Sequence, residues 1–173
     1  MQFVRQGPDL PERLLQAHEE GRVVFFCGAG VSYPAGLPGF SGLVKDVFAA
    51  VGATPSAVQQ AAIDAGQFDT AIGLLESSVI VGREGVRRAI SSVLTPTKMT
   101  KDATASHDAL LTLSKTRDGR TRLITTNFDR LFESVIGSKE LPVVRYCAPL
   151  LPVPKNRWDG LVYLHGLLAP TAN

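Results

Sequence analysis

An uninterrupted apolar run that ends in a glycine-rich turn constrains the fold of this chain most. Residues 23–27 (VVFFC) contain no polar side chain, and residues 28–32 (GAGVS) follow directly. A continuous apolar run of this length is typical of a strand buried on both faces, as in a parallel sheet. Ligands of such sheets bind beyond the carboxyl ends of the strands, which is where this turn would lie.

The turn at residues 28–32 has two interpretations. Gly28 allows a sharp bend, Gly30 leaves room for a diphosphate to approach the backbone amides, and the Ser32 hydroxyl can donate a hydrogen bond. The third glycine of the usual dinucleotide fingerprint is absent, because Tyr33 stands there. The alternative is a tight glycine turn that binds no ligand. Spacing alone does not choose between them.

Short apolar runs alternate with segments of helical pattern along the chain. A block of helices predicts a helical insertion at about residues 41–115, with Ser41 as its first cap. The alternation predicts an α/β fold with a Rossmann-like, mostly parallel sheet and flanking helices. A doubly wound sheet would use at least one more strand and helix, so we expect residues 1–173 to be one domain of a longer protein. The other predicted strands are 123–125, 143–144 and 161–164, and the other predicted helices are 9–21, 104–114 and 128–137.

Two further motifs place polar residues directly after predicted strands. Asn127 and Asp129 follow residues 123–125, and His165 follows the last predicted strand. Parallel strands end at one edge of a sheet, so these side chains would lie beside the glycine turn. Each also has a structural interpretation, with Asn127 as a helix N-cap, Asp129 in the first helical turn and His165 as a satisfied core histidine. Three polar strand ends beside a glycine turn favour a binding site over capping alone.

Composition narrows the class of protein. The net charge of +2 gives no broad basic field for nucleic acid. Cys27 and Cys147 form no CxxC pair, which argues against a structural zinc module and a disulfide framework. No apolar run approaches the roughly 20 residues of a membrane span, and the N-terminus lacks the apolar core of a signal peptide. We expect a cytoplasmic protein that requires no metal and binds neither nucleic acid nor membranes directly.

Four motifs, taken in order, resemble the sirtuin (SIR2-type) family. Sirtuins carry a GAG-[IV]-S loop, a G-[IL]-P-x-F segment, a [TQ]-N-[IF]-D motif and a later H-G. In this chain the four motifs span residues 28–166, which is most of its length. The matching residues are Gly28-Ala29-Gly30-Val31-Ser32, Gly36-Leu37-Pro38-Gly39-Phe40, Thr126-Asn127-Phe128-Asp129 and His165-Gly166.

The resemblance implies NAD as the ligand and a role for each matching residue. Asn127 would position the attacking group and the ribose hydroxyls, and His165 would act as a base at those hydroxyls. Asp129 would bind the carboxamide of nicotinamide, and Phe40 would lie over the nicotinamide ribose. The other residues that would bind NAD are Gly28, Ala29, Gly30, Val31, Ser32 and Thr126.

Two departures separate this chain from deacylase sirtuins. Those proteins have D-F-R after the proline of the second motif, where this chain has Gly39 and Ser41 in place of the aspartate and the arginine. They also carry a four-cysteine zinc module, for which this chain has no ligands. The sequence is more similar to the SIR2-like domains of bacterial antiphage defence systems, which hydrolyse NAD.

The resemblance therefore predicts an NAD⁺ hydrolase that cleaves the bond between nicotinamide and ribose. Its products would be nicotinamide and ADP-ribose, and NAD depletion would make it an effector of antiphage defence. We expect a homo-oligomer coupled to a sensor partner such as an ATPase or an Argonaute-like protein. Two alternatives remain open: a non-catalytic sensor of NAD or ADP-ribose, and a protein deacylase or ADP-ribosyltransferase.

Overall fold

The computed structural model describes residues 1–151 and 158–169, and the chain folds into two compact units. The first unit combines residues 1–28 with residues 105–167. The second unit is formed by residues 29–104, together with residues 168–169 of the described chain. The expectation of a single domain over residues 1–173 stays a prediction.

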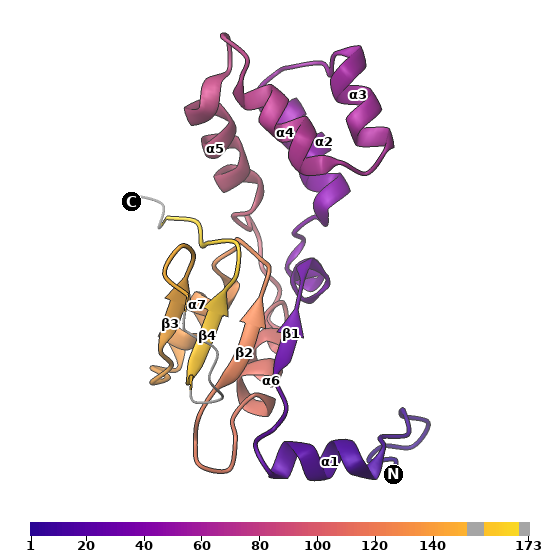
Figure 1. The fold of residues 1–173 in the computed structure, drawn as a ribbon, viewed down its shortest axis with the longest axis vertical. Coiled ribbons are helices and arrows are strands. Elements are labelled where there is room, and N and C mark those ends of the chain that lie inside the picture. The colour runs from indigo at the N-terminus through magenta and orange to yellow at the C-terminus, as the bar shows by residue number, and fades with distance from the viewer. Residues whose placement is uncertain (152–157, 170–173) are drawn as a thin grey trace. The chain divides into compact units, whose positions relative to one another are not determined.

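A four-stranded sheet forms the centre of the first unit (Figure 1). Its strands are β1 (Phe25–Cys27), β2 (Arg122–Thr125), β3 (Arg145–Cys147) and β4 (Gly160–Tyr163). Their order in the sheet is β1-β2-β4-β3, and every neighbouring pair is parallel. The predicted α/β fold with a parallel sheet is therefore confirmed.

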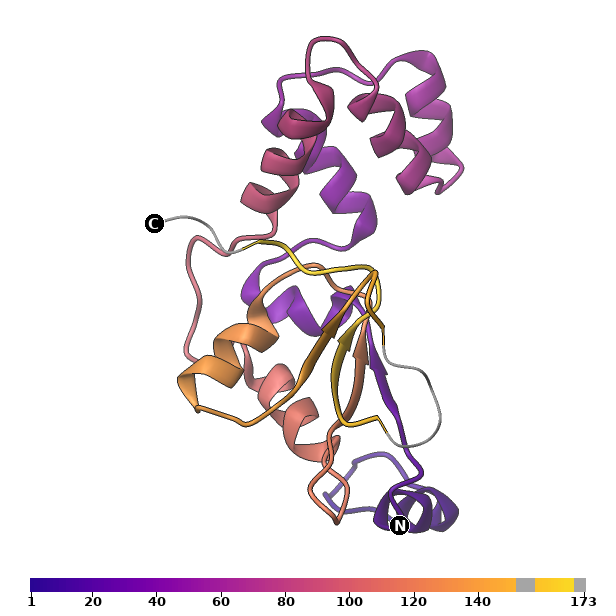
Figure 2. The ribbon, with the colours of Figure 1, turned by 60° about the vertical axis from the view of Figure 1, so that its left-hand side comes forward.

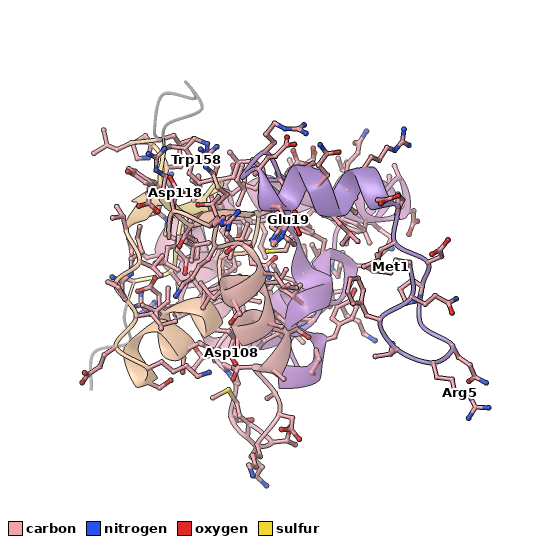
Figure 3. All side chains as sticks on the ribbon, turned by 90° about the horizontal axis from the view of Figure 1, so that it is seen from below. Met1, Arg5, Glu19, Asp108, Asp118 and Trp158 are labelled. Carbon is pink, nitrogen blue, oxygen red and sulfur yellow. The ribbon has the colours of Figure 1, made fainter. Side chains whose placement is uncertain are left out.

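Two helices of the first unit, α6 (Ala105–Leu113) and α7 (Leu131–Ser138), pack together on one face of the sheet (Figures 1 and 2). The core of this unit lies between them and the strands, where Leu123, Leu161 and Phe132 have no exposed surface. The remaining helix of this unit, α1 (Glu12–Glu19), precedes β1. Figure 3 shows Asp108 of α6 and Trp158 on opposite sides of the sheet.

The face of the sheet opposite α6 and α7 is partly exposed. Cys27 is buried toward the helices, whereas its neighbour Phe26 is 63% exposed, because successive side chains of a strand point to opposite faces. The expectation that residues 23–27 are buried on both faces is therefore wrong here. Farther along this face, the Arg122 guanidinium lies 5.8 Å from the centre of the Trp158 ring.

The second unit is helical. It begins with a 3₁₀ helix, η1 (Ala29–Ala35), and continues with α2 (Phe40–Ala50), α3 (Ala57–Asp64), α4 (Phe68–Glu76) and α5 (Gly82–Val93). Helices α2, α4 and α5 pack against one another, and α3 packs against α4. The contacts between α2, α4 and α5 bury apolar side chains, which are Val44, Val47, Phe48, Ala71, Leu75, Val86 and Ala89.

Local sequence signals set the ends of these helices. Ser56 and Gln59 form a capping box at the start of α3, in which each side chain bonds the backbone N–H of the other. Gly52 and Gly66 follow α2 and α3 with positive φ angles, a conformation that favours glycine after a helix. The expected cap at Ser41 is wrong, because α2 begins at Phe40 with Gly39 as its N-cap.

The helices of the expected insertion divide between the two units. Helices α2 to α5 belong to the second unit, whereas α6 belongs to the first and packs against α7. Strand β3 begins at Arg145 and so lies just after the predicted residues 143–144. In the described part of the chain, none of the helices is both long and apolar enough for a membrane span.

Candidate functional site

Three neighbouring strands of the first unit end side by side. Cys27 pairs with Thr125 in the β1–β2 register, and Thr125 pairs with Tyr163 in the β2–β4 register. The hydrogen bonds continue one residue further, because the Thr126 N–H donates to the Cys27 carbonyl at 3.1 Å and the Leu164 N–H donates to the Thr125 carbonyl at 2.9 Å. Asn127 and His165 each follow this row by two residues.

Backbone amides that donate to side-chain oxygens hold the turn from Asn127 to Asp129. The Asn127 N–H donates to the Thr125 hydroxyl oxygen at 3.1 Å, and the Leu131 N–H donates to Asp129 Oδ1 at 3.0 Å. Helix α7 begins only at Leu131, so the expected helix from residue 128 and the alternative role of Asn127 as its N-cap are both wrong. Asp129 satisfies an amide at the helix start instead. Asn127 and Asp129 are 6% and 4% exposed.

His165 lies at the surface of the first unit. Its ring centre is 6.2 Å from that of Phe128, with the two planes inclined at 39°. Gly166 has a φ of 102°, and its N–H donates to the Tyr163 carbonyl at 3.3 Å, so a tight turn directly follows the imidazole. Since His165 is exposed, its interpretation as a core histidine is wrong. Phe128, which sequence reasoning did not single out, is the aromatic neighbour of this imidazole.

A partly buried hydrogen-bond network connects β3 and β4 to α7. The Tyr163 hydroxyl donates to Glu133 Oε1 at 3.1 Å, and Arg145 Nε donates to the same oxygen at 3.3 Å. Tyr163 has no exposed surface, and burial together with the Glu133 carboxylate raises the pKa of this phenol far above its usual value. The phenol therefore remains a donor and ties β4 to α7. The only sequence signal was an acidic residue in the first turn of a helix that has no other charged side chain.

The charge of the Asp129 carboxylate favours a higher pKa in two buried side chains, Cys27 and His107. Burial raises the pKa of the Cys27 thiol, and the charge of Asp129 raises it further. His107 on α6 has no exposed surface, and its ring meets Phe132 edge-on with centres 4.7 Å apart. Burial lowers the pKa of His107, while Asp129 opposes that shift. The layer beneath the strand ends thus holds a thiol and a neutral imidazole near neutral pH.

The glycines of the turn after β1 are not explained by backbone conformation. Neither Gly28 nor Gly30 has a positive φ, whereas Gly36 of the next motif does. A Cβ at Gly30 would meet no atom of the described chain within 4 Å, and one at Gly28 would lie 3.4 Å from the Thr126 hydroxyl oxygen. A tight turn that depends on glycine is therefore not what these residues form. Room for a ligand at the Gly30 backbone remains a physical reason for the residue.

The comparisons with known proteins bear on the strand ends of β2 and β4. Residues 121–173 match the SIR2-like domain. This match contains Asn127, Asp129 and His165. A curated protein of Sinorhizobium fredii (strain NBRC 101917 / NGR234), Uncharacterized protein y4cA, is 35% identical to the chain over 173 residues. The alignment covers 97% of this chain, which spans 14% of the length of that relative. No solved structure matches the chain.

The candidate residues are divided between the two units. The strand ends of the first unit carry Gly28, Thr126, Asn127, Asp129 and His165, and the SIR2-like match contains all of these except Gly28. The candidate residues of the second unit differ in exposure. Ser32 in η1 is 1% exposed, whereas Phe40 at the start of α2 is 49% exposed. The candidate residues that lie in the second unit are Ala29, Gly30, Val31, Ser32 and Phe40. Their roles in NAD binding stay predictions.

The described residues offer little for a metal ion. Within residues 1–151 and 158–169, no group of three or more His, Cys, Asp or Glu side chains has the geometry to hold one. The polar groups at the strand ends are an amide, a carboxylate and an imidazole. These are groups that orient a polar organic molecule and transfer protons.

Proposed function

We propose that this chain hydrolyses NAD⁺ at the bond between nicotinamide and ribose. The proposal rests on one observation: β1, β2 and β4 end in a single register row, which Asn127 and His165 both follow by two residues. The SIR2-like match over these residues and the sirtuin resemblance of the sequence support NAD as the substrate.

The bond to be broken carries its own leaving group. Nicotinamide is cationic while attached to ribose and neutral once released, so the bonding electron pair leaves with its nitrogen. The ribose carbon then resembles an oxocarbenium ion, and one water oxygen adds to it. The proton that the water loses goes to His165 or to solvent, and the products are nicotinamide and ADP-ribose.

The proposal assigns a task to three candidate residues of the first unit. Asn127 positions the water and the ribose hydroxyls, since its amide both donates and accepts hydrogen bonds. Positioning of this kind removes several kcal/mol, in order of magnitude, from a barrier. His165 accepts the proton, an effect of about 10²–10⁴-fold in rate. Asp129 binds the carboxamide of nicotinamide, and this role adds to its bond with the Leu131 N–H.

The decisive experiment measures nicotinamide release and NAD binding for Asn127→Ala and His165→Ala. We expect both variants to lose turnover by about 10²-fold or more, with NAD binding largely retained in His165→Ala. His18→Gln is the matched control. This histidine lies on α1, which precedes β1 in the chain, and not at the carboxyl ends of the strands. Its imidazole contacts the Leu113 carbonyl at 2.7 Å. Turnover that survives both substitutions would refute the assignment.

The same assay separates the alternatives. An NAD or ADP-ribose sensor would bind its ligand without releasing nicotinamide, and a deacylase or ADP-ribosyltransferase would release it only with a protein acceptor. Because activity can depend on assembly, turnover and oligomeric state are measured together, with and without candidate sensor partners such as an ATPase or an Argonaute-like protein. The antiphage role predicts that cellular NAD falls on infection only when Asn127 and His165 are intact.

A further inference from the structure

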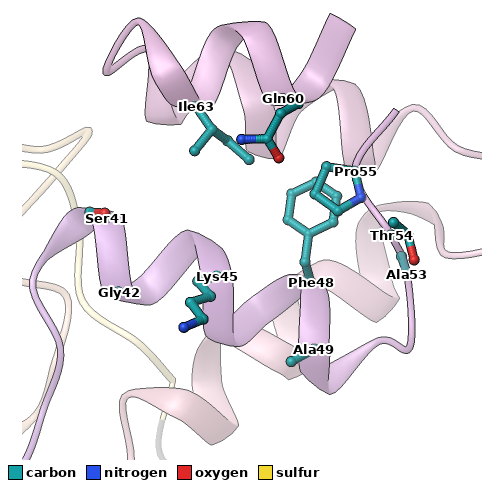
Figure 4. A pocket seen from close by; sticks show the side chains of 10 residues that line it. All are labelled: Ser41, Gly42, Lys45, Phe48, Ala49, Ala53, Thr54, Pro55, Gln60 and Ile63. Carbon is teal, nitrogen blue, oxygen red and sulfur yellow. The ribbon is translucent and has the colours of Figure 1, made fainter. Parts of the chain in front are cut away.

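A pocket of about 470 Å³ lies between α2 and α3, entirely inside the second unit (Figure 4). Its volume falls within the range of roughly 300–1,000 Å³ that is usual for small-molecule sites. None of the residues assigned to NAD lines it. The pocket is therefore a separate feature of the helical unit.

The base of the pocket is apolar. Phe48 of α2 is 3% exposed, and Pro55 and Ile63 line the pocket with it from the α2–α3 connection and from α3. Figure 4 shows the ring of Phe48 beside Pro55, with Ile63 extending from the opposite helix. Two rings and a branched aliphatic chain form a surface for a ring or an alkyl chain.

The rim of the pocket is polar and carries one positive charge. Lys45 projects from the middle of α2, and the hydroxyl groups of Ser41 and Thr54 line the same pocket. Across residues 1–151 and 158–169, the structure pairs none of these three side chains with a hydrogen-bond or ion-pair partner. The amide of Gln60 on the α3 side, in contrast, donates to Asp64 at 2.7 Å.

We propose that this pocket binds a small organic anion with an apolar body. The apolar body covers Phe48, Pro55 and Ile63, and the carboxylate or phosphate of the ligand pairs with Lys45. The hydroxyl of Ser41, which precedes Lys45 by four residues on α2, is the additional donor for its oxygens. This site is independent of the proposed NAD chemistry, because it uses none of the same residues.

The test uses octanoate as the probe, with 1-octanol as its neutral counterpart and acetate as the anion without an apolar body. Binding to the 173-residue chain is measured by calorimetry, and the site is located from amide shifts in ¹H–¹⁵N spectra. We expect octanoate to bind more tightly than either counterpart and to shift the amides of residues 41–63.

Lys45→Met separates the charge from the apolar contacts. Loss of an exposed ion pair predicts octanoate binding weaker by about fivefold and unchanged binding of 1-octanol. Lys98→Met is the matched control, since Lys98 is an exposed lysine of the same unit outside the pocket. Ile63→Ala should weaken both long-chain probes. Equal binding of octanoate to the parent and to Lys45→Met, or shifts confined to residues outside 41–63, would overturn the proposal.

Discussion

Replacing Gly30 with alanine separates a structural glycine from one that leaves room for a ligand. The φ of Gly30 is not positive, and a Cβ at this position meets no described atom within 4 Å. The folded chain therefore accepts the methyl group without strain, while the unfolded chain loses conformational freedom. Such a change stabilises a protein by about 0.4–1 kcal/mol.

The expected gain in stability is small but measurable as a shift in Tm. For a chain of this length, 1 kcal/mol corresponds to about 2–4 °C in Tm, so Gly30→Ala should raise Tm by about 1–4 °C. The ligand experiences the opposite effect. A phosphate oxygen bonded to a backbone amide lies about 2.9 Å from the nitrogen, and a methyl group beside that amide obstructs the approach. We expect the Kd for NAD to rise about tenfold or more.

The assay combines thermal unfolding with calorimetric titration of NAD. Gly73→Ala is the matched control, because Gly73 lies within α4 and its Cβ also meets no described atom within 4 Å. This control should gain a similar amount of stability and keep its affinity for NAD. Unchanged NAD affinity in Gly30→Ala would refute the phosphate-loop interpretation, and a fall in Tm would refute the steric argument.

Three further changes test the packing of each unit. Tyr163→Phe should cost about 1 kcal/mol at neutral pH in urea denaturation, since the donor to Glu133 is lost. The raised pKa of Tyr163 means that its contribution is present below about pH 10 and is lost as pH rises further, so the parent should lose more stability than this variant in alkaline urea titrations. His107→Gln should flatten the loss of stability on acidification below about pH 6.5, because the lowered pKa of His107 favours its neutral form in the folded state; an unchanged slope would contradict this. Ser56→Ala should cost about 1 kcal/mol by removing the capping box of α3, and an unaltered Tm would argue against that cap.

The strands that bring the candidate residues together could be predicted because they are local apolar runs next to polar motifs. Strands β2 and β4 lie within one residue of the segments predicted from the sequence. The start of α7 was misplaced because Asn127 and Asp129 both suit a helix start, and only the structure shows that Asp129 bonds the Leu131 amide. A pattern of residue types does not reveal which of two capping residues is used.

Long-range pairings were not accessible from the sequence. The Tyr163–Glu133 bond joins residues 30 positions apart, and neither residue belongs to a recognisable spacing. The exposure of Phe26 was also not predicted, because an apolar run does not indicate whether helices cover one face of the sheet or both. The division of the helical segment between two units depends on α6 packing against α7, which helical periodicity along one segment does not encode.

The two-residue interval that separates Asn127 from Thr125, and His165 from Tyr163, has a consequence for sequence variation. The sheet hydrogen bonds continue only to Thr126 and Leu164, and residues 163–166 then form a turn that the Gly166 N–H closes on the Tyr163 carbonyl, so the length of each interval fixes how far beyond the last paired residue the side chain lies. Inserting or deleting one residue in either interval would displace the amide or the imidazole from the strand end, even if its identity were kept. Loops elsewhere can change length freely, whereas these two short intervals should tolerate substitutions far better than indels.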